Sequence, residues 1–141
     1  MNNIERIVLI DDNELDNEYQ EIIIRRAGFT GEVVMLEDGV AALRYFGEAD
    51  TSRRTLVFLD INMPMMNGFE VALAATPMVA AWPSIVFLML TSSAAISDKQ
   101  KAAEIGLIKG FMSKPWTKEA MKTLLNGALP GMGDASRTAP T

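Results

Sequence analysis

The sequence predicts an α/β fold in which a five-stranded parallel sheet carries helices on both faces. Two observations lead to this prediction. Short, almost wholly apolar runs bounded by polar residues recur along the chain, and such runs are typical of strands buried on both faces. Segments with apolar residues at helical spacing lie between them. The resulting order βαβαβαβαβα favours three layers built around a parallel sheet.

The first half of the chain supplies three of the expected strands, at residues 7–10, 32–36 and 56–60. Between the first two, a helix is predicted by the spacing of its apolar residues and by the stop signal Gly28. Those apolar residues, expected on one buried face, are Leu15, Tyr19, Ile22, Ile23 and Ala27. A second helix is expected over residues 39–46.

The second half repeats the alternation. We expect a third helix over residues 68–75, a loop marked by Pro77 and Pro83, and a strand over 85–91. Ser97 and Gln100 fit a capping box that opens the fourth helix. A strand over 108–113 and a helix capped by Thr117 complete the pattern. We therefore expect one domain over residues 1–128 and a flexible tail over 129–141.

Composition excludes several classes of function. The net charge of −5 and the isoelectric point near 4.7 argue against nucleic acid as a partner. The chain has no cysteine and no histidine, which excludes thiolate chemistry and a histidine-based triad or zinc site. There is no apolar run of the ~20 residues that span a bilayer, and no signal-peptide layout. We expect a cytoplasmic protein without membrane association.

Polar side chains follow four of the expected strands. Asp11 and Asp12 come after the first strand, Asp60 ends the third, Thr91 ends the fourth, and Lys114 follows the fifth. Ligands of parallel sheets bind at the carboxyl ends of the strands. These four runs therefore predict a single site with three carboxylates, a hydroxyl and an ammonium.

The chemistry of such a site follows from its charges. Two carboxylates 4 Å apart repel by ~4 kcal/mol at an effective dielectric of 20, so the cluster needs a cation or raised pKa values. An all-oxygen ligand set favours Mg²⁺. For a single Asp, capping of the first helix is an equally good explanation. Asp60 is a candidate nucleophile that would carry an aspartyl-phosphate, with Lys114 and Thr91 as ligands of the phosphoryl oxygens. The bond between Lys114 and Pro115 is a candidate cis peptide.

These residues resemble the receiver domain of response regulators in two-component signalling, best known from the chemotaxis receiver, with its (βα)5 flavodoxin-like fold. The resemblance covers about residues 4–128. It is carried by four motifs in order along the chain: Ile10-Asp11-Asp12-Asn13, Leu59-Asp60-Ile61-Asn62-Met63-Pro64 with Gly68, Leu90-Thr91-Ser92-Ser93, and Phe111-Met112-Ser113-Lys114-Pro115.

The resemblance implies a role for each matching residue. Asp60 would be the phospho-acceptor. Asp12, Asp60 and the backbone carbonyl of Asn62 would hold Mg²⁺ directly, with Asp11 acting through water. Lys114 and Thr91 would bind the phosphoryl group. The switch would consist of Thr91 and Phe111, the residues that tune dephosphorylation would be Asn62 and Ser93, and the face from the fourth helix to the fifth would change on activation.

The resemblance also implies partners. A histidine kinase or a histidine phosphotransfer protein would supply the phosphoryl group, and the outward residues of the first helix (Glu14, Asn17, Glu18 and Glu21) would select it. The downstream protein partner is unassigned. We expect a stand-alone receiver, with a fragment of a longer protein as the alternative, and a monomer, with a phosphorylation-dependent dimer as the alternative. The protein would not be an enzyme beyond its own phosphorylation and dephosphorylation.

Three other functions remain open at this point. A phosphorylation-independent docking module would keep the same fold. A phosphatase of the haloacid dehalogenase type would also use an Asp nucleophile with Mg²⁺, but it needs a second Asp where this chain has Asn62. A flavodoxin-like ligand binder would need a phosphate-binding loop after the first strand, where Asp11 and Asp12 stand instead.

Overall fold

The computed structural model describes residues 4–91, 96–114 and 116–126. One sheet holds five parallel strands in the order β2-β1-β3-β4-β5, as expected from the sequence. The strands are β1 (Arg6–Ile10), β2 (Glu32–Leu36), β3 (Thr55–Asp60), β4 (Ile85–Thr91) and β5 (Ile108–Ser113). The helices are α1 (Glu14–Arg26), α2 (Gly39–Glu48), α3 (Gly68–Met78), α4 (Ile96–Ala103) and α5 (Lys118–Leu125).

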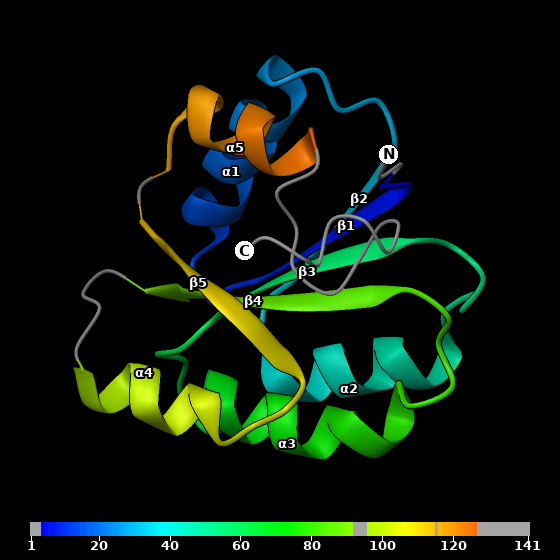
Figure 1. The fold of residues 1–141 in the computed structure, drawn as a ribbon, viewed down its shortest axis with the longest axis vertical. Coiled ribbons are helices and arrows are strands. Elements are labelled where there is room, and N and C mark those ends of the chain that lie inside the picture. Colours follow the sequence, from blue (N-terminus) through cyan, green and yellow to red (C-terminus); the bar gives the residue numbers. More distant parts are fainter. Residues whose placement is uncertain (1–3, 92–95, 115, 127–141) are drawn as a thin grey trace, which may run out of the picture.

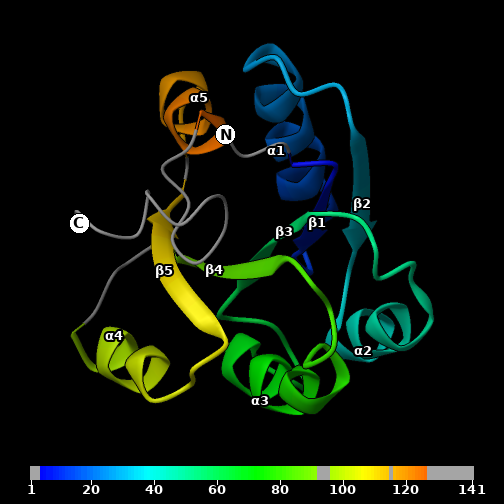
Figure 2. The same ribbon diagram turned by 45° about the vertical axis from the view of Figure 1, so that its right-hand side comes forward.

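The helices cover the two faces of the sheet unequally. Helices α1 and α5 lie on one face, and α2, α3 and α4 lie on the other (Figures 1 and 2). Alternate residues of each central strand enter opposite cores: in β3, Val57 packs into the core under α2 and α3, while Phe58 packs into the core under α1 and α5. The three central strands are buried on both faces because each face is covered by helices.

The buried face of α1 differs from the one predicted by its apolar residues. Leu15 is 74% exposed, Tyr19 47% and Ile22 49%. Asn17 and Gln20 are instead buried with Ile23 and Ile24. The physical reason lies at the start of the helix, where the Asn17 side-chain amide donates to the backbone carbonyl of Asp11 at 3.0 Å. This bond, together with the buried Ile23 and Ile24, holds that face of the helix against the sheet, and the stripe of Leu15, Tyr19 and Ile22 faces solvent.

Two helix ends also differ from prediction. Helix α3 continues to Met78, so Pro77 lies in its last turn and not in the loop. Only two further residues follow in the helix or at its cap, so the missing Pro77 N–H interrupts a single late hydrogen bond. Helix α4 begins at Ile96, so Ser97 lies within its first turn and not at the N-cap. The predicted N-cap of the last helix is confirmed, because the Thr117 hydroxyl accepts from the Ala120 N–H.

At the amino ends of the strands, a buried arginine joins β1 to its neighbours. Arg6 is 3% exposed. Its Nε donates to the Thr55 hydroxyl at 3.1 Å, and its Nη2 donates to the Asp50 carbonyl at 2.6 Å. The guanidinium also lies over the rings of Tyr45 and Trp82, at 5.7 and 5.4 Å from their centroids. This end of the sheet is therefore held by buried polar and aromatic contacts.

Some predicted features lie outside the described residues: Ser93, Pro115 with the candidate cis bond, and the tail over 129–141. The boundary at residue 128 stays a prediction. Within the described ranges, none of the helices combines the length and the apolar character that crossing a bilayer requires.

Candidate functional site

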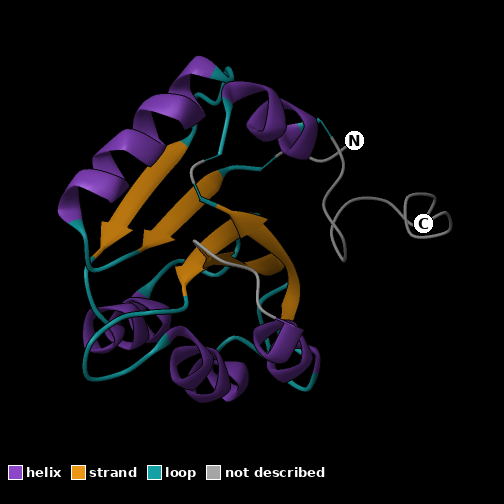
Figure 3. Cartoon of the chain, turned by 90° about the vertical axis from the view of Figure 1, so that its left-hand side faces the viewer, coloured by secondary structure: helices purple, strands orange, loops and turns teal. Residues whose placement is uncertain are grey.

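The carboxyl ends of the strands bring the predicted polar residues to one edge of the sheet. Ile10 is the register partner of Leu59, so Asp11 and Asp60 follow at neighbouring strand ends. Thr91 ends β4 opposite Ser113 of β5, and the Lys114 N–H donates to the Thr91 carbonyl at 2.8 Å. The strand arrows in Figure 3 run toward this common edge. The parallel pairing is thus what assembles the site.

Three of these residues form a compact acidic cluster. One carboxylate oxygen from each of Asp11, Asp12 and Asp60 lies within 4.8 Å of the others. Asp11 is fully buried and Asp60 is 7% exposed, whereas Asp12 is exposed. The Asn13 N–H donates to Asp11 Oδ1 at 3.0 Å, which orients the buried carboxylate. The cluster is therefore open to solvent on the Asp12 side.

Lys114 brings a positive charge into this cluster. Its Nζ donates to Asp11 Oδ2 at 2.6 Å and lies 3.5 Å from Asp60 Oδ1. The Lys114 side chain is only 17% exposed. Burial lowers the pKa of this amine, but the hydrogen bond to Asp11 and the charges of Asp60, Asp11 and Asp16 outweigh it, so its pKa is raised. The residue is an ammonium at neutral pH.

The Asp60 carboxyl has the most altered acidity at the site. Burial raises the pKa of Asp60 to about 6, against the lowering effect of Lys114 and with a further increase from Asp11. A hydrogen bond from the Asn62 backbone N–H lowers it again in part. One lysine therefore does not neutralise the cluster, and Asp60 remains a costly charge at neutral pH.

The residues present fit a bound Mg²⁺. The cluster offers carboxylate oxygens alone, and one of the three is exposed, so a hydrated cation has a route to it. Mg²⁺ prefers a few carboxylates together with waters and phosphate oxygens. Burial and the neighbouring Asp11 charge raise the pKa of Asp60, and a cation bound to the cluster would favour its ionised form.

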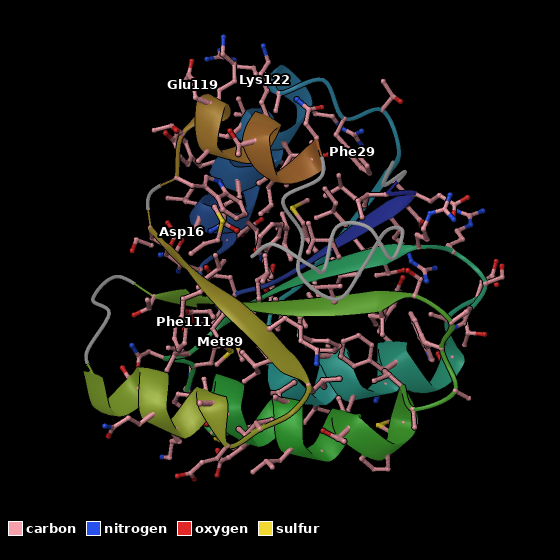
Figure 4. The ribbon with its side chains drawn as sticks, viewed as in Figure 1. Asp16, Phe29, Met89, Phe111, Glu119 and Lys122 are labelled. Atoms are coloured by element: carbon pink, nitrogen blue, oxygen red, sulfur yellow. The ribbon has the colours of Figure 1, made fainter. Side chains whose placement is uncertain are left out.

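The other predicted residues surround the cluster at different depths. Thr91 is 2% exposed, and Asn62 lies exposed in the loop after β3. Phe111 is half-buried, opposite Met89 of β4, and both are labelled in Figure 4. Phe111 also lines a hollow of about 360 Å³ with Ala102, Ala103, Ile108, Lys109 and Gly110, between α4 and β5. Phe111 thus borders this hollow.

The loop after β3 closes tightly under the site. Its Met65 has φ +71° and a fully exposed side chain. The Gly68 N–H then donates to the Ile61 carbonyl at 2.8 Å, and a Cβ at Gly68 would collide with the backbone carbonyl oxygen of Asp60. Glycine at position 68 is what lets α3 begin directly against Asp60.

Sequence reasoning missed one charged residue at the site. Asp16 Oδ2 lies 3.4 Å from the Lys114 Nζ. Asp16, labelled in Figure 4, stands where the start of α1 meets the end of β5. The available signal was its place in the first turn of α1, the helix that begins directly after the acidic pair and the Asn13 cap.

Comparison with known proteins decides the family. The family model for the response regulator receiver domain matches residues 7–126. The chain belongs to the response regulator receiver domain family. It is therefore a receiver domain of two-component signalling, as the four motifs predicted.

Two relatives of this receiver domain are named as regulatory proteins. FilR2 of Methanothrix harundinacea, a probable methanogenesis regulatory protein, is 32% identical over 122 residues, which cover 82% of this chain and 76% of FilR2. PhoP of Bacillus subtilis, a transcriptional regulator of alkaline phosphatase synthesis, is 27% identical over 88% of this chain, which spans only 48% of PhoP.

Solved structures of receiver proteins have the same fold as this chain. The structure of the chemotaxis protein CheY4 of Vibrio cholerae matches with a TM-score of 0.72 at 26% identity, covering 88% of this chain and 98% of CheY4. A receiver protein of Dyadobacter fermentans matches with a TM-score of 0.74 at 26% identity, covering 86% of this chain and 94% of that protein. The predicted flavodoxin-like receiver fold is confirmed.

Proposed function

We propose that this receiver domain accepts a phosphoryl group on Asp60 from a phosphohistidine of a partner protein. The observation that carries this proposal is the convergence of Asp11, Asp12 and Asp60 within 4.8 Å, with the Lys114 ammonium 3.5 Å from Asp60. The chain has no histidine, so the donor histidine belongs to another molecule. The donor is a histidine kinase or a histidine phosphotransfer protein.

Asp60 is the nucleophile. One of its carboxylate oxygens attacks the phosphorus in line, a P–O bond forms, the P–N bond of the phosphohistidine breaks, and its electron pair returns to the imidazole. The reaction needs the ionised carboxylate, which predominates above the Asp60 pKa of about 6. Lys114 and the Thr91 hydroxyl hold the phosphoryl oxygens, and hydrolysis of the aspartyl-phosphate returns the resting state.

Asp12, Asp60 and the Asn62 backbone carbonyl would hold Mg²⁺, with Asp11 contributing through water. Bound there, Mg²⁺ would supply positive charge against the oxygens of the transferring phosphoryl group. The chain itself orients the site: the Asn13 N–H and the Lys114 ammonium fix both oxygens of Asp11, at 3.0 and 2.6 Å. Asn62 and Ser93, two residues beyond Asp60 and Thr91, tune the rate of dephosphorylation.

The switch runs from Thr91 to Phe111. A phosphoryl group on Asp60 draws the Thr91 hydroxyl toward it, and the half-buried Phe111 ring follows inward. The hollow beside Phe111 supports this proposal, because the ring borders a space between α4 and β5 into which side chains can move. The surface from α4 to α5 is then the one that a downstream protein reads.

The partner that supplies the phosphoryl group docks on α1. The exposed stripe of Leu15, Tyr19 and Ile22 supports this assignment. It faces solvent and begins in the first turn of α1, directly after the acidic residues of the site. This docking surface is apolar at its centre, whereas the sequence predicted a charged one. Asn17, expected there, is buried and is not part of it.

The decisive experiment is an amide NMR spectrum with Mg²⁺, recorded with and without beryllofluoride, which mimics the aspartyl-phosphate. We expect shifts at Asp60 and Thr91 that extend to Phe111 and α4, and no response in Asp60→Asn. Asp50→Asn makes the same chemical change at the opposite end of the sheet and should respond as wild type does. A response to Mg²⁺ alone would reject the phospho-switch in favour of a docking module that works without phosphorylation.

A further inference from the structure

Three carboxylates from three different elements surround the Lys114 ammonium. Asp11 follows β1, Asp60 ends β3, and Asp16 lies in the first turn of α1. Their oxygens lie 2.6, 3.5 and 3.4 Å from Nζ, respectively. An ammonium has three N–H donors. At rest, therefore, each donor of Lys114 has a carboxylate within reach.

Asp16 differs from the other two carboxylates. It is outside the acidic cluster of Asp11, Asp12 and Asp60, so a cation held by that cluster does not neutralise it. Its backbone N–H donates to the Asn13 side chain at 3.1 Å, which fixes it in the first turn of α1. Its side chain is 45% exposed, against 1% for Asp11. Asp16 thus offers Lys114 a carboxylate that does not belong to the cluster.

We propose that Asp16 is a positioning residue that holds the Lys114 ammonium on the α1 side of the site and so weakens the hold of the site on a phosphoryl group. This inference rests on the proposed function of Asp60 and Lys114. A phosphoryl group on Asp60 needs an N–H donor of Lys114, and Asp16 competes for it. The Asp16 charge also repels the phosphoryl oxygens. Both effects act in the same direction.

The position of Asp16 links this restraint to the docking surface. Leu15, the first residue of the exposed stripe on α1, is its neighbour in the chain. A partner seated on that stripe covers the exposed half of Asp16, or pairs with it, and Lys114 becomes available to the incoming phosphoryl group. The contact between Asp16 and Lys114 is thus a point where docking on α1 can act on the acceptor.

The test compares Asp16→Asn with Glu14→Gln by titrating beryllofluoride in the presence of Mg²⁺. Glu14 is exposed in the same first turn and is not among the described contacts of Lys114. Its substitution makes the same change in net charge but leaves the contact between Asp16 and Lys114 in place. We expect Asp16→Asn to bind beryllofluoride about two- to fivefold more tightly than wild type, the range for a partly exposed ion pair. Glu14→Gln should bind as wild type does, and Asp16→Glu should restore wild-type affinity.

A second readout reports on Lys114 directly. The ¹⁵N resonance of its ammonium, recorded without Mg²⁺, should shift in Asp16→Asn and stay in place in Glu14→Gln. Equal affinities for the two variants, or an unmoved ammonium resonance, would overturn the role of Asp16 while leaving the proposed function standing. Wild-type protein that does not bind beryllofluoride would overturn both. If Asp16→Asn does not fold, Asp16→Ser takes its place in both measurements, with the same expected results.

Discussion

The Lys114 ammonium lies closer to Asp11, at 2.6 Å, than to Asp60, at 3.5 Å. In the resting protein the lysine therefore pairs first with a carboxylate that is not the proposed acceptor. Asp60 is left partly uncompensated, and burial raises its pKa to about 6. The site therefore carries more negative than positive charge. This imbalance determines how the stability of the protein depends on pH and on bound cations.

The stability of the metal-free protein should depend on pH through Asp60. Its folded-state pKa of about 6 lies above the ordinary value of 3.8, so the folded state binds more protons between these pH values. The stabilisation from the neutral carboxyl is complete below pH ~4 and is lost as pH rises through ~6. After allowance for screening by solvent the loss is about 2 kcal/mol.

Asp60→Asn removes this titration. In metal-free buffer the variant should gain stability relative to wild type between pH 4 and 7, as measured by urea unfolding at each pH. Since other carboxylates titrate in both proteins, the difference between the two curves is the quantity that isolates Asp60. A difference that does not change with pH would contradict the raised pKa.

Lys114→Met should destabilise the metal-free protein by about 1–3 kcal/mol, because Asp11 and Asp60 lose the cation between them. Mg²⁺ should recover a larger part of the stability in the variant than it adds to wild type. Thermal unfolding with and without Mg²⁺ measures both effects. Lys118→Met, an exposed lysine at the start of α5, is the control and should leave both values near wild type.

Gly68→Ala should lower stability by about 1–3 kcal/mol and weaken Mg²⁺ binding. The added Cβ would collide with the backbone carbonyl of Asp60, so the acceptor strand or the start of α3 must move. Gly106→Ala is the matched control, because no atom lies within 4 Å of a Cβ built there. Comparable losses in the two variants would rule out the specific contact with Asp60.

Met65→Gly should raise the stability by about 0.5–1 kcal/mol. The residue has φ +71°, a left-handed conformation that costs a side chain more than glycine loses in chain entropy. Its side chain is fully exposed, so no packing is lost. Met65→Ala keeps the Cβ and should show no such gain in chemical denaturation. A similar gain from alanine would mean that something other than backbone conformation is responsible.

The parallel sheet and the acidic cluster were predictable because both depend on strands. A strand such as residues 56–60 can be recognised by its unbroken apolar run. The last residue of such a strand then lies at the carboxyl edge of the sheet, where ligands bind. The buried face of α1 was not predictable from its apolar residues. Leu15, Tyr19 and Ile22 have the spacing of a core stripe but face solvent, whereas the polar Asn17 faces inward and donates to the Asp11 carbonyl.

The contact between Asp16 and Lys114 escaped prediction for a related reason. It joins residues 98 positions apart in the sequence and depends on how α1 is rotated over the sheet. Apolar periodicity indicates which face of a helix is hydrophobic, but in α1 the apolar residues are divided between a buried and an exposed face. The rotation of α1 follows from the whole buried face, Asn17 and Gln20 together with Ile23 and Ile24, which the spacing of the apolar residues alone does not reveal.

The arginine at the other end of the sheet has a consequence for how the molecule can move. Arg6 joins β1 to the start of β3 and lies over the rings of Tyr45 and Trp82, at the end of the sheet opposite Asp60. We expect these contacts to hold the amino ends of β1 and β3 in register when the charge at the other end of the sheet changes. A structural change caused by a group bound at Asp60 is then expected in the loops and helix ends around it. These are the parts of the molecule that another protein can contact.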